Sequence, residues 1–151
     1  MALYFLDTSA LVKLYVMEPG TQQLVRLASK RFENHLAISA LSPVEARSAI
    51  RRRERSGDID PEAAALILDR LRRHLETLFL RQALNDIVLD GALEMIDRYA
   101  LRAYDAIQLA GCLALRSTAG AEPPTFVCAD QHLLEAARSE LLPVLDPCSQ
   151  P

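Results

Sequence analysis

Short apolar runs alternate along the chain with longer segments in which apolar residues recur every three or four positions. The runs show little internal alternation, which is typical of strands that helices cover on both faces. We predict strands at residues 3–6, 36–39, 78–84, 125–129 and 141–145. Residues 78–84 alternate loosely, so a continuation of the preceding helix is the alternative there.

The segments between these strands have the periodicity of amphipathic helices. Helices are predicted at residues 10–16, 21–31, 42–55, 60–78, 86–99, 104–116 and 131–138. We expect Thr8 or Ser9 to start the first helix, and Ser42 with Glu45 matches a capping pattern for the third. Strands separated by helices predict an α/β fold, a three-layer α/β/α sandwich with a mostly parallel central sheet.

Length and composition are those of one ordinary globular domain. The chain has 151 residues, half of them apolar and a quarter charged, without repeats or low-complexity segments. We predict a single domain over residues 1–146 and a flexible tail over 147–151. The formal net charge of −3 disfavours broad, sequence-independent binding to nucleic acid, which would need local basic patches or bound cations.

The cysteines and the N-terminus indicate a reducing compartment. Cys112, Cys128 and Cys148 are odd in number and far apart, which argues against a disulfide framework and a structural zinc site. The apolar N-terminus lacks a basic leader and contains Asp7, so we do not expect a signal peptide. No segment approaches the ~20 apolar residues that cross a bilayer. We predict a cytoplasmic protein with no membrane association.

Four carboxylates occupy equivalent places in this pattern. Asp7 and Asp130 directly follow predicted strands, while Glu45 and Asp105 lie in the first turns of predicted helices. In a parallel sheet all four face the same edge. Helix capping is the alternative for each acid taken alone, because carboxylates are favoured at helix N-termini.

Capping does not explain why separate segments bring acids to one edge, or why Asp105 stands in an apolar context. Carboxylates that approach within ~6 Å repel one another unless a cation lies among them. The grouping therefore predicts a metal ion. Because the set offers only oxygen ligands, it favours Mg²⁺ or Mn²⁺ over zinc.

These motifs together resemble a PIN domain, specifically the small VapC-type toxin ribonucleases of type II toxin–antitoxin systems. The matching segments are LDTSALVK at 6–13, SPVE at 42–45, YDAIQLA at 104–110, and CAD at 128–130 followed by Leu133. Their order and spacing cover nearly the whole chain and imply a PIN-like, Rossmannoid fold. Cys128 departs from the pattern, because similar proteins often have threonine or serine there.

The resemblance implies a Mg²⁺-dependent endoribonuclease, with Mn²⁺ as a substitute, that acts as a toxin. It assigns catalysis and metal binding to Asp7, Glu45, Asp105 and Asp130, with Asp7 as the central ligand. Hydrolysis of an RNA phosphodiester bond by such a site leaves 5′-phosphate and 3′-hydroxyl ends.

Four further residues are candidates for auxiliary roles. Thr8 or Ser9 would orient water or phosphate, although capping explains either equally well. Arg52 lies two helical turns after Glu45 on the same face and could meet an RNA phosphate; a solvated, dipole-compensating face is the alternative. Gln108, one turn after the third acid, is a candidate substrate contact, with plain helix polarity as the alternative.

Partner binding is implied by analogy. Apolar residues of the first two helices, including Leu11 and Leu24, exceed what one small sheet needs. Similar proteins use this region for homodimerisation and for an amphipathic segment of the antitoxin, so we expect a homodimer and a cognate antitoxin.

Two other functions are left open. The predicted sheet is also compatible with another Mg²⁺-dependent phosphoryl hydrolase. However, the haloacid-dehalogenase motif has a second aspartate at the position of Ser9, and the sequence has no glycine-rich phosphate-binding loop. A PIN-like module that binds RNA or protein without cutting is the second, although retention of all four acids speaks against it.

Overall fold

Five parallel strands form the central sheet within residues 1–149, which are those that the computed structural model describes. The strands are β1 (Ala2–Leu6), β2 (Asn34–Ser39), β3 (Phe79–Gln82), β4 (Thr125–Val127) and β5 (Val144–Leu145). Their order is β3-β2-β1-β4-β5, and each neighbouring pair is parallel. The prediction of a mostly parallel sheet is confirmed, and residues 79–82 form a strand and not an extension of the preceding helix.

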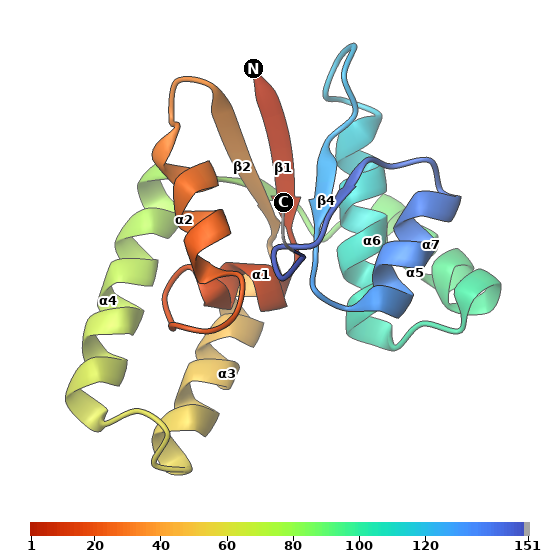
Figure 1. Ribbon diagram of the computed structural model, residues 1–151. Coiled ribbons are helices and arrows are strands. Elements are labelled where there is room, and N and C mark those ends of the chain that lie inside the picture. Colours follow the sequence, from red (N-terminus) through yellow and green to blue (C-terminus); the bar gives the residue numbers. More distant parts are fainter. Residues whose placement is uncertain (150–151) are drawn as a thin grey trace.

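Helices cover both faces of this sheet (Figure 1). They are α1 (Thr8–Lys13), α2 (Thr21–Ser29), α3 (Ser42–Arg55), α4 (Pro61–Thr77), α5 (Asp86–Tyr99), α6 (Ala103–Arg116) and α7 (Gln131–Ser139). Figure 1 shows α1 to α4 on one side of the strands and α5 to α7 on the other. The three-layer α/β/α sandwich is therefore confirmed.

Two hydrophobic cores follow from the alternation of side chains along β1. Phe5 points to the face covered by α5, α6 and α7, where its ring stacks on Phe126 with centroids 6.1 Å apart. Leu6 points to the opposite face and packs among residues of the first four helices. Because successive strand residues face opposite ways, a single apolar strand supplies both cores.

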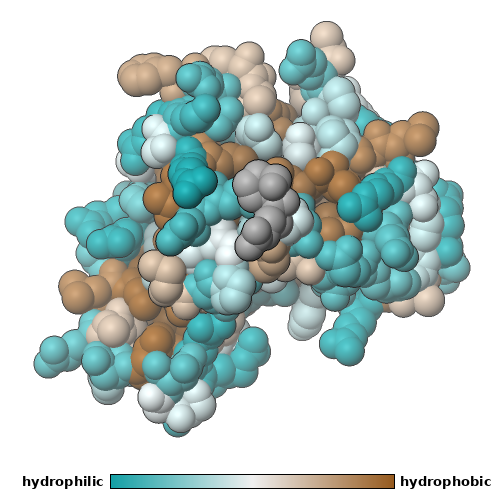
Figure 2. All heavy atoms as spheres, viewed as in Figure 1, coloured by the Kyte–Doolittle hydropathy of each residue, from teal (hydrophilic) through white to brown (hydrophobic). Residues whose placement is uncertain are grey.

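Leu11 and Leu24 belong to the second of these cores. Their exposed fractions are 0% and 1%, so they contact the chain's own interior. The expectation that these two leucines form a surface for partners is wrong, because the apolar faces of the two helices pack into the core on this side of the sheet. On the face drawn in Figure 2, hydrophilic residues cover most of the surface and hydrophobic residues form smaller groups between them.

The first helix begins at Thr8 and ends at Lys13, so it starts two residues before the predicted range 10–16 and ends three residues before its end. Asp7 is the N-cap of α1, and its side chain accepts a hydrogen bond from the backbone N–H of Ala10 at 2.8 Å. The hydroxyl of Ser9 instead donates to the Asp7 carboxylate. The acid that ends β1 therefore also starts α1, which fixes its orientation from both sides.

The capping pattern predicted for α3 is also corrected. Leu41 precedes the helix without a side-chain cap, and Ser42 is its first residue. The Ser42 side chain is buried and accepts hydrogen bonds from Thr8 and Gln108. Glu45 likewise bonds to other elements. Tertiary contacts have taken the polar groups that would otherwise cap the helix.

The strand order creates a switch point between β1 and β4. The chain runs from β1 outward through β2 to β3, and then crosses to β4 on the other side of β1. In open α/β sheets, ligands bind at the carboxyl ends of the strands beside such a point. Asp7 directly follows β1 and Asp130 lies shortly after β4, so both reach this edge as predicted.

The C-terminal segment returns toward the loop before α2. Cys148 Sγ lies 3.3 Å from the carbonyl oxygen of Pro19, and Gly20 adopts φ +95° where a side chain would meet Pro147. Residues 150–151 of the predicted flexible tail lie outside the described residues. None of the helices that the structure describes has the length and hydrophobicity that a bilayer crossing requires.

Candidate active site

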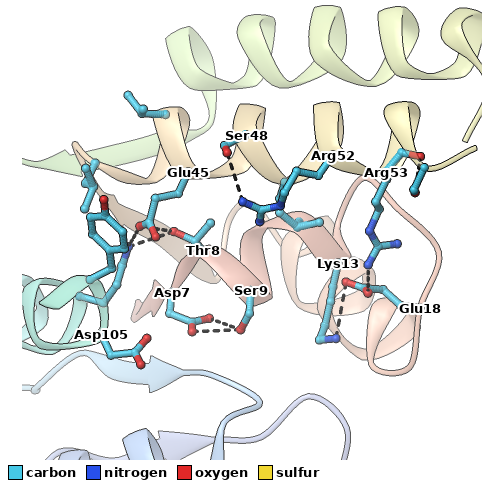
Figure 3. Close-up of a pocket in the computed structure, with 17 residues that line it drawn as sticks. Asp7, Thr8, Ser9, Lys13, Glu18, Glu45, Ser48, Arg52, Arg53 and Asp105 are labelled. Carbon is cyan, nitrogen blue, oxygen red and sulfur yellow. Dashed lines mark hydrogen bonds and ion pairs between the residues drawn. The ribbon is translucent and has the colours of Figure 1, made fainter. Parts of the chain in front are cut away.

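A cavity of about 820 Å³ opens at the carboxyl edge of the sheet. Three of the four predicted acids line it: Asp7, Glu45 and Asp105 (Figure 3). Thr8 and Ser9 line it too. The acids come from the end of β1, from α3 and from α6, so segments distant in sequence meet here. Asp130 is not part of the cavity wall.

Asp7 is the most buried of these acids, with 5% of its surface exposed. The Ser9 hydroxyl lies 2.8 and 2.9 Å from its two carboxylate oxygens. Burial raises the pKa of Asp7 to about 6; the hydrogen bonds from Ala10 and Ser9 oppose this, and the charge of Asp105 adds to it. The carboxylate is oriented by two donors but remains costly to ionise.

Glu45 is held by a network of neutral side chains. Its Oε1 accepts hydrogen bonds from Thr8 Oγ1 at 2.8 Å and from Gln108 Nε2 at 2.9 Å. Gln108 Nε2 also lies 3.0 Å from Thr8 Oγ1 and 3.1 Å from Ser42 Oγ. This network ties α1, α3 and α6 together at one carboxylate oxygen.

Gln108 itself is only 2% exposed. Its Oε1 is the one buried side-chain oxygen or nitrogen in the described part of the chain that lacks a hydrogen-bond partner. Leaving such an atom unpaired costs about 1–3 kcal/mol. The amide orientation that lets Nε2 donate to Glu45 also leaves Oε1 unpaired, so this orientation has a cost in stability. The structure gives Gln108 a role in orienting Glu45, and its contact with RNA stays a prediction.

Asp105 couples the cavity to the fourth acid. Burial raises its pKa, and the charges of Asp130 and Glu45 raise it further, while Arg102 and His132 oppose them. Carboxylates that shift one another in this way share an electrostatic environment. Asp130 therefore belongs to the same acidic region although it stands outside the cavity wall.

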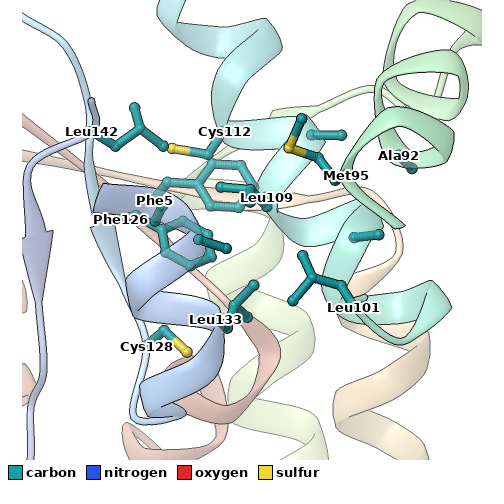
Figure 4. Close-up of a cluster of buried hydrophobic side chains, with 14 of the residues drawn as sticks. Phe5, Ala92, Met95, Leu101, Leu109, Cys112, Phe126, Cys128, Leu133 and Leu142 are labelled. Atoms are coloured by element: carbon teal, nitrogen blue, oxygen red, sulfur yellow. The ribbon is translucent and has the colours of Figure 1, made fainter. Parts of the chain in front are cut away.

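Asp130 is exposed and caps α7 by accepting the backbone N–H of Leu133 at 2.8 Å. Cys128 lies behind it, within the hydrophobic cluster drawn in Figure 4, and its Sγ is 3.2 Å from the Asp130 backbone nitrogen. Burial, followed by the charge of Asp7, raises the pKa of the Cys128 thiol. At neutral pH the thiol is therefore protonated.

The donor set fits a hard divalent cation. In the part of the chain that the structure describes, no three acidic, histidine or cysteine side chains are close enough to form a complete metal site as they stand. However, the acids raise one another's pKa, and a cation would reverse that effect. All their ligand atoms are oxygens, which Mg²⁺ and Mn²⁺ prefer.

The far end of the cavity is basic. Arg52 lines it, as expected, and is exposed with a 3.3 Å hydrogen bond to Ser48. Lys13 and Arg53 line it too, and sequence reasoning missed both. For Lys13 a signal existed, because it follows Ser9 by four residues and so shares a helix face with it.

Comparisons with known proteins place this geometry in context. The family model described as PIN domain matches residues 4–139. No curated protein matches the sequence.

Several solved structures share the fold. A toxin–antitoxin complex from Klebsiella pneumoniae matches with 17% identity and a TM-score of 0.66, covering 95% of this chain and 97% of that chain. The sarcin–ricin-loop-cleaving toxin VapC20 of Mycobacterium tuberculosis matches with 17% identity and a TM-score of 0.65, covering 89% and 95%. VapBC2 from Rickettsia felis, bound to promoter DNA, matches with 15% identity and a TM-score of 0.61, covering 95% and 97%.

Proposed function

This chain belongs to the PIN domain family, and from that premise we propose that it is a Mg²⁺- or Mn²⁺-dependent endoribonuclease. The observation that supports this most strongly is the convergence of Asp7, Glu45 and Asp105 on one cavity at the switch point of the sheet. Three separate elements deliver these acids, and helix capping accounts for only one of them, since Asp7 alone caps a helix.

Asp7, Glu45, Asp105 and Asp130 would hold the divalent cation, directly or through water. When bound, the cation supplies charge stabilisation at the scissile phosphate and lowers the pKa of an attacking water. Asp7 is the central ligand in this proposal, because it is the most buried acid.

The chain's own residues prepare these carboxylates. Ser9 and the Ala10 N–H orient Asp7, and Thr8 with Gln108 orients Glu45 through its Oε1. With a pKa of about 6, Asp7 is largely ionised at neutral pH and is available as a ligand. Ligands fixed before binding lose less conformational freedom when the substrate arrives.

We further propose that the protein is the toxin of a toxin–antitoxin pair, with RNA as its substrate, a cognate antitoxin as its inhibitor, and a homodimer as its working form in the cytoplasm. The structural neighbours include toxin–antitoxin complexes and an RNA-cleaving toxin. The unpaired state of all three cysteines agrees with a reducing compartment.

The test is cleavage of total RNA by the purified protein with Mg²⁺, with Mn²⁺ and with EDTA. Asp7→Asn is the test variant. Asp60→Asn is the matched control, because Asp60 also caps a helix by accepting a backbone N–H, at 2.7 Å, but is exposed and does not line the cavity. Discrete cuts with 5′-phosphate ends are expected for the wild type and for Asp60→Asn, and none for Asp7→Asn or in EDTA. Intact RNA with folded, metal-loaded wild type would overturn the proposal.

A further inference from the structure

Asp146 is a further carboxylate at the carboxyl edge of the sheet, where it directly follows β5. Both of its side-chain oxygens accept hydrogen bonds from the chain itself. Oδ2 accepts from Nε2 of Gln131 at 2.8 Å, and Oδ1 accepts from the backbone N–H of Cys148 at 2.9 Å. Asp146 is therefore arranged to hold other residues in position.

Residues 146–149, which we call the C-terminal strap, are fixed against the loop that follows α1. Figure 1 shows the dark-blue end of the chain crossing from the side of α7 toward α2. Pro147 is buried beside Gly20, where an added Cβ would lie 2.9 Å from the Pro147 carbonyl oxygen. The Cys148 thiol lies 3.3 Å from the carbonyl oxygen of Pro19. Through Asp146 and Gln131, the strap thus connects this loop to the first turn of α7.

The strap links two helices that each begin at a predicted metal ligand. Asp7 is the N-cap of α1, and Asp130 is the N-cap of α7. The loop after α1 also carries Glu18, which lines the cavity and pairs with Arg53 of α3 at 2.6 Å. The strap therefore spans the edge of the sheet between the helix of Asp7 and the helix of Asp130.

The sheet alone does not fix the direction of the Asp130 side chain. Asp130 is exposed and lies three residues after Val127, the last residue of β4. Because its carboxylate caps α7, its direction depends on where the first turn of that helix lies. Gln131 ties this turn to the strap, and His132 ties it to α5. Of these two contacts, the strap contact leads to the side of the sheet on which α1 lies.

Anchoring the end of the chain accounts for part of these contacts. Pro147 and Cys148 are sufficient to fasten the strap to the loop after α1. The bond between Asp146 and Gln131 adds something different, because Gln131 is the residue directly after Asp130. This bond holds the start of α7, and it is the part of the strap that an anchoring role leaves unexplained.

We propose that Asp146 is a positioning residue for the cation site: through Gln131 it fixes the first turn of α7 and so directs the Asp130 carboxylate toward the other acids. This inference rests on the proposed function. Groups that orient metal ligands without binding the metal typically change metal affinity by about 10- to 100-fold when they are removed. Because Asp130 is exposed and stands outside the cavity wall, we expect the lower end of this range.

Mn²⁺ binding to the RNA-free protein, measured by isothermal titration calorimetry, tests this role apart from cleavage. Asp146→Ala and Gln131→Ala remove the same hydrogen bond from its two sides, so each should weaken Mn²⁺ binding about tenfold. The double variant should lose no more than either single variant. Gln131→Ala leaves the net charge unchanged, so an equal loss there separates positioning from the loss of a negative charge. Gln131 is exposed at the start of a helix, where alanine keeps the fold.

Glu140→Ala is the matched control. Glu140 fastens the other end of α7, where it accepts a hydrogen bond from Tyr99 at 3.0 Å and pairs with Arg98. Its removal should lower the Tm, because it loosens the same helix, but leave Mn²⁺ affinity unchanged. Asp130→Asn provides the second comparison. In that background Asp146→Ala should cause no further loss of Mn²⁺ affinity, because the residue through which Asp146 acts is gone.

The two proposals fail separately. Wild-type Mn²⁺ affinity in folded Gln131→Ala, an equal loss in Glu140→Ala, or a further tenfold loss in the Asp130→Asn background would each overturn the role of Asp146. Metal-dependent RNA cleavage by the wild type would still stand in each case. The expected Mn²⁺ affinities without RNA cleavage in either metal would overturn the nuclease and keep the positioning role. Absence of Mn²⁺ binding by the folded wild type would overturn both.

Discussion

Replacing Asp7 with asparagine should stabilise the metal-free protein while it abolishes activity. Asp7 is buried, and its ionised carboxylate repels Asp105. Asparagine has nearly the same size and can still accept the Ala10 N–H as an N-cap. It removes the charge that burial disfavours. The catalytic acid is therefore expected to be a cost to the fold until a cation binds.

The magnitude follows from the pKa of Asp7. A value of about 6 in the folded chain against 3.8 for the ordinary carboxyl corresponds to about 3 kcal/mol. Because the pKa of Asp7 is higher in the folded chain than in the unfolded chain, burial of this side chain lowers the free energy of unfolding of the wild type only when the carboxyl is ionised. The wild type therefore keeps its full stability below about pH 4 and loses about 3 kcal/mol of it as the pH rises through about 6. Asp7→Asn has no such loss. The free energy of unfolding of Asp7→Asn should equal that of the wild type at pH 4 and exceed it by about 3 kcal/mol at pH 7.5, which corresponds to about 6–12 °C in Tm.

Thermal and urea unfolding in EDTA between pH 4 and pH 8 would measure this difference. Asp60→Asn serves as control, because it changes an exposed N-cap without removing a buried charge. Adding Mg²⁺ should raise the Tm of the wild type and leave Asp7→Asn nearly unchanged, since binding stabilises only a state with an intact site. The reasoning is refuted if Asp7→Asn melts at or below the wild type at pH 7.5, or if its advantage is the same at pH 4.

Three further predictions concern the site and its support. Gln108→Leu should lower kcat/KM about 10- to 100-fold with the fold intact, because a hydrogen bond to a charged carboxylate is worth about 1.5–3 kcal/mol. Single-turnover cleavage measures this rate, and an unchanged rate would contradict the role assigned to Gln108. The Mn²⁺ concentration for half-maximal cleavage should rise about tenfold between pH 7.5 and pH 5, since protons compete with the cation at Asp7; a flat activation profile would argue against this. Gly111→Ala should destabilise the fold, because the added Cβ would lie 3.3 Å from Cζ of the fully buried Phe5, and this crowding should outweigh the about 1 kcal/mol that alanine gains over glycine inside a helix; an unchanged or higher urea midpoint would show that the core relaxes.

The strands and the acids at their ends could be predicted from local pattern. A short apolar run such as β1 has no stable place except between two helical layers, so the polar residue that ends it must emerge at the sheet edge. That argument brought Asp7 and Asp130 to the edge. The same logic located the turn that carries Glu45 and the helix that carries Asp105.

The partners of these acids depended on tertiary structure. Gln108 meets Glu45 across 63 positions of sequence, and Arg53 meets Glu18 across 35. Such pairs depend on how far each helix rotates and slides against the sheet, which no pattern within one helix specifies. For the same reason Ser42 failed as a cap, since its hydroxyl was taken by another helix.

The amino-acid sequence by itself thus determined the layers, the parallel sheet and the edge where the acids gather, because each depends on the periodicity of burial within one element. Only the tertiary structure decided that Asp130 stands outside the cavity wall, that Gln108 serves Glu45, and that Lys13 lies nearly buried opposite the acids. These outcomes arise from packing between elements, where a small shift changes which side chains touch.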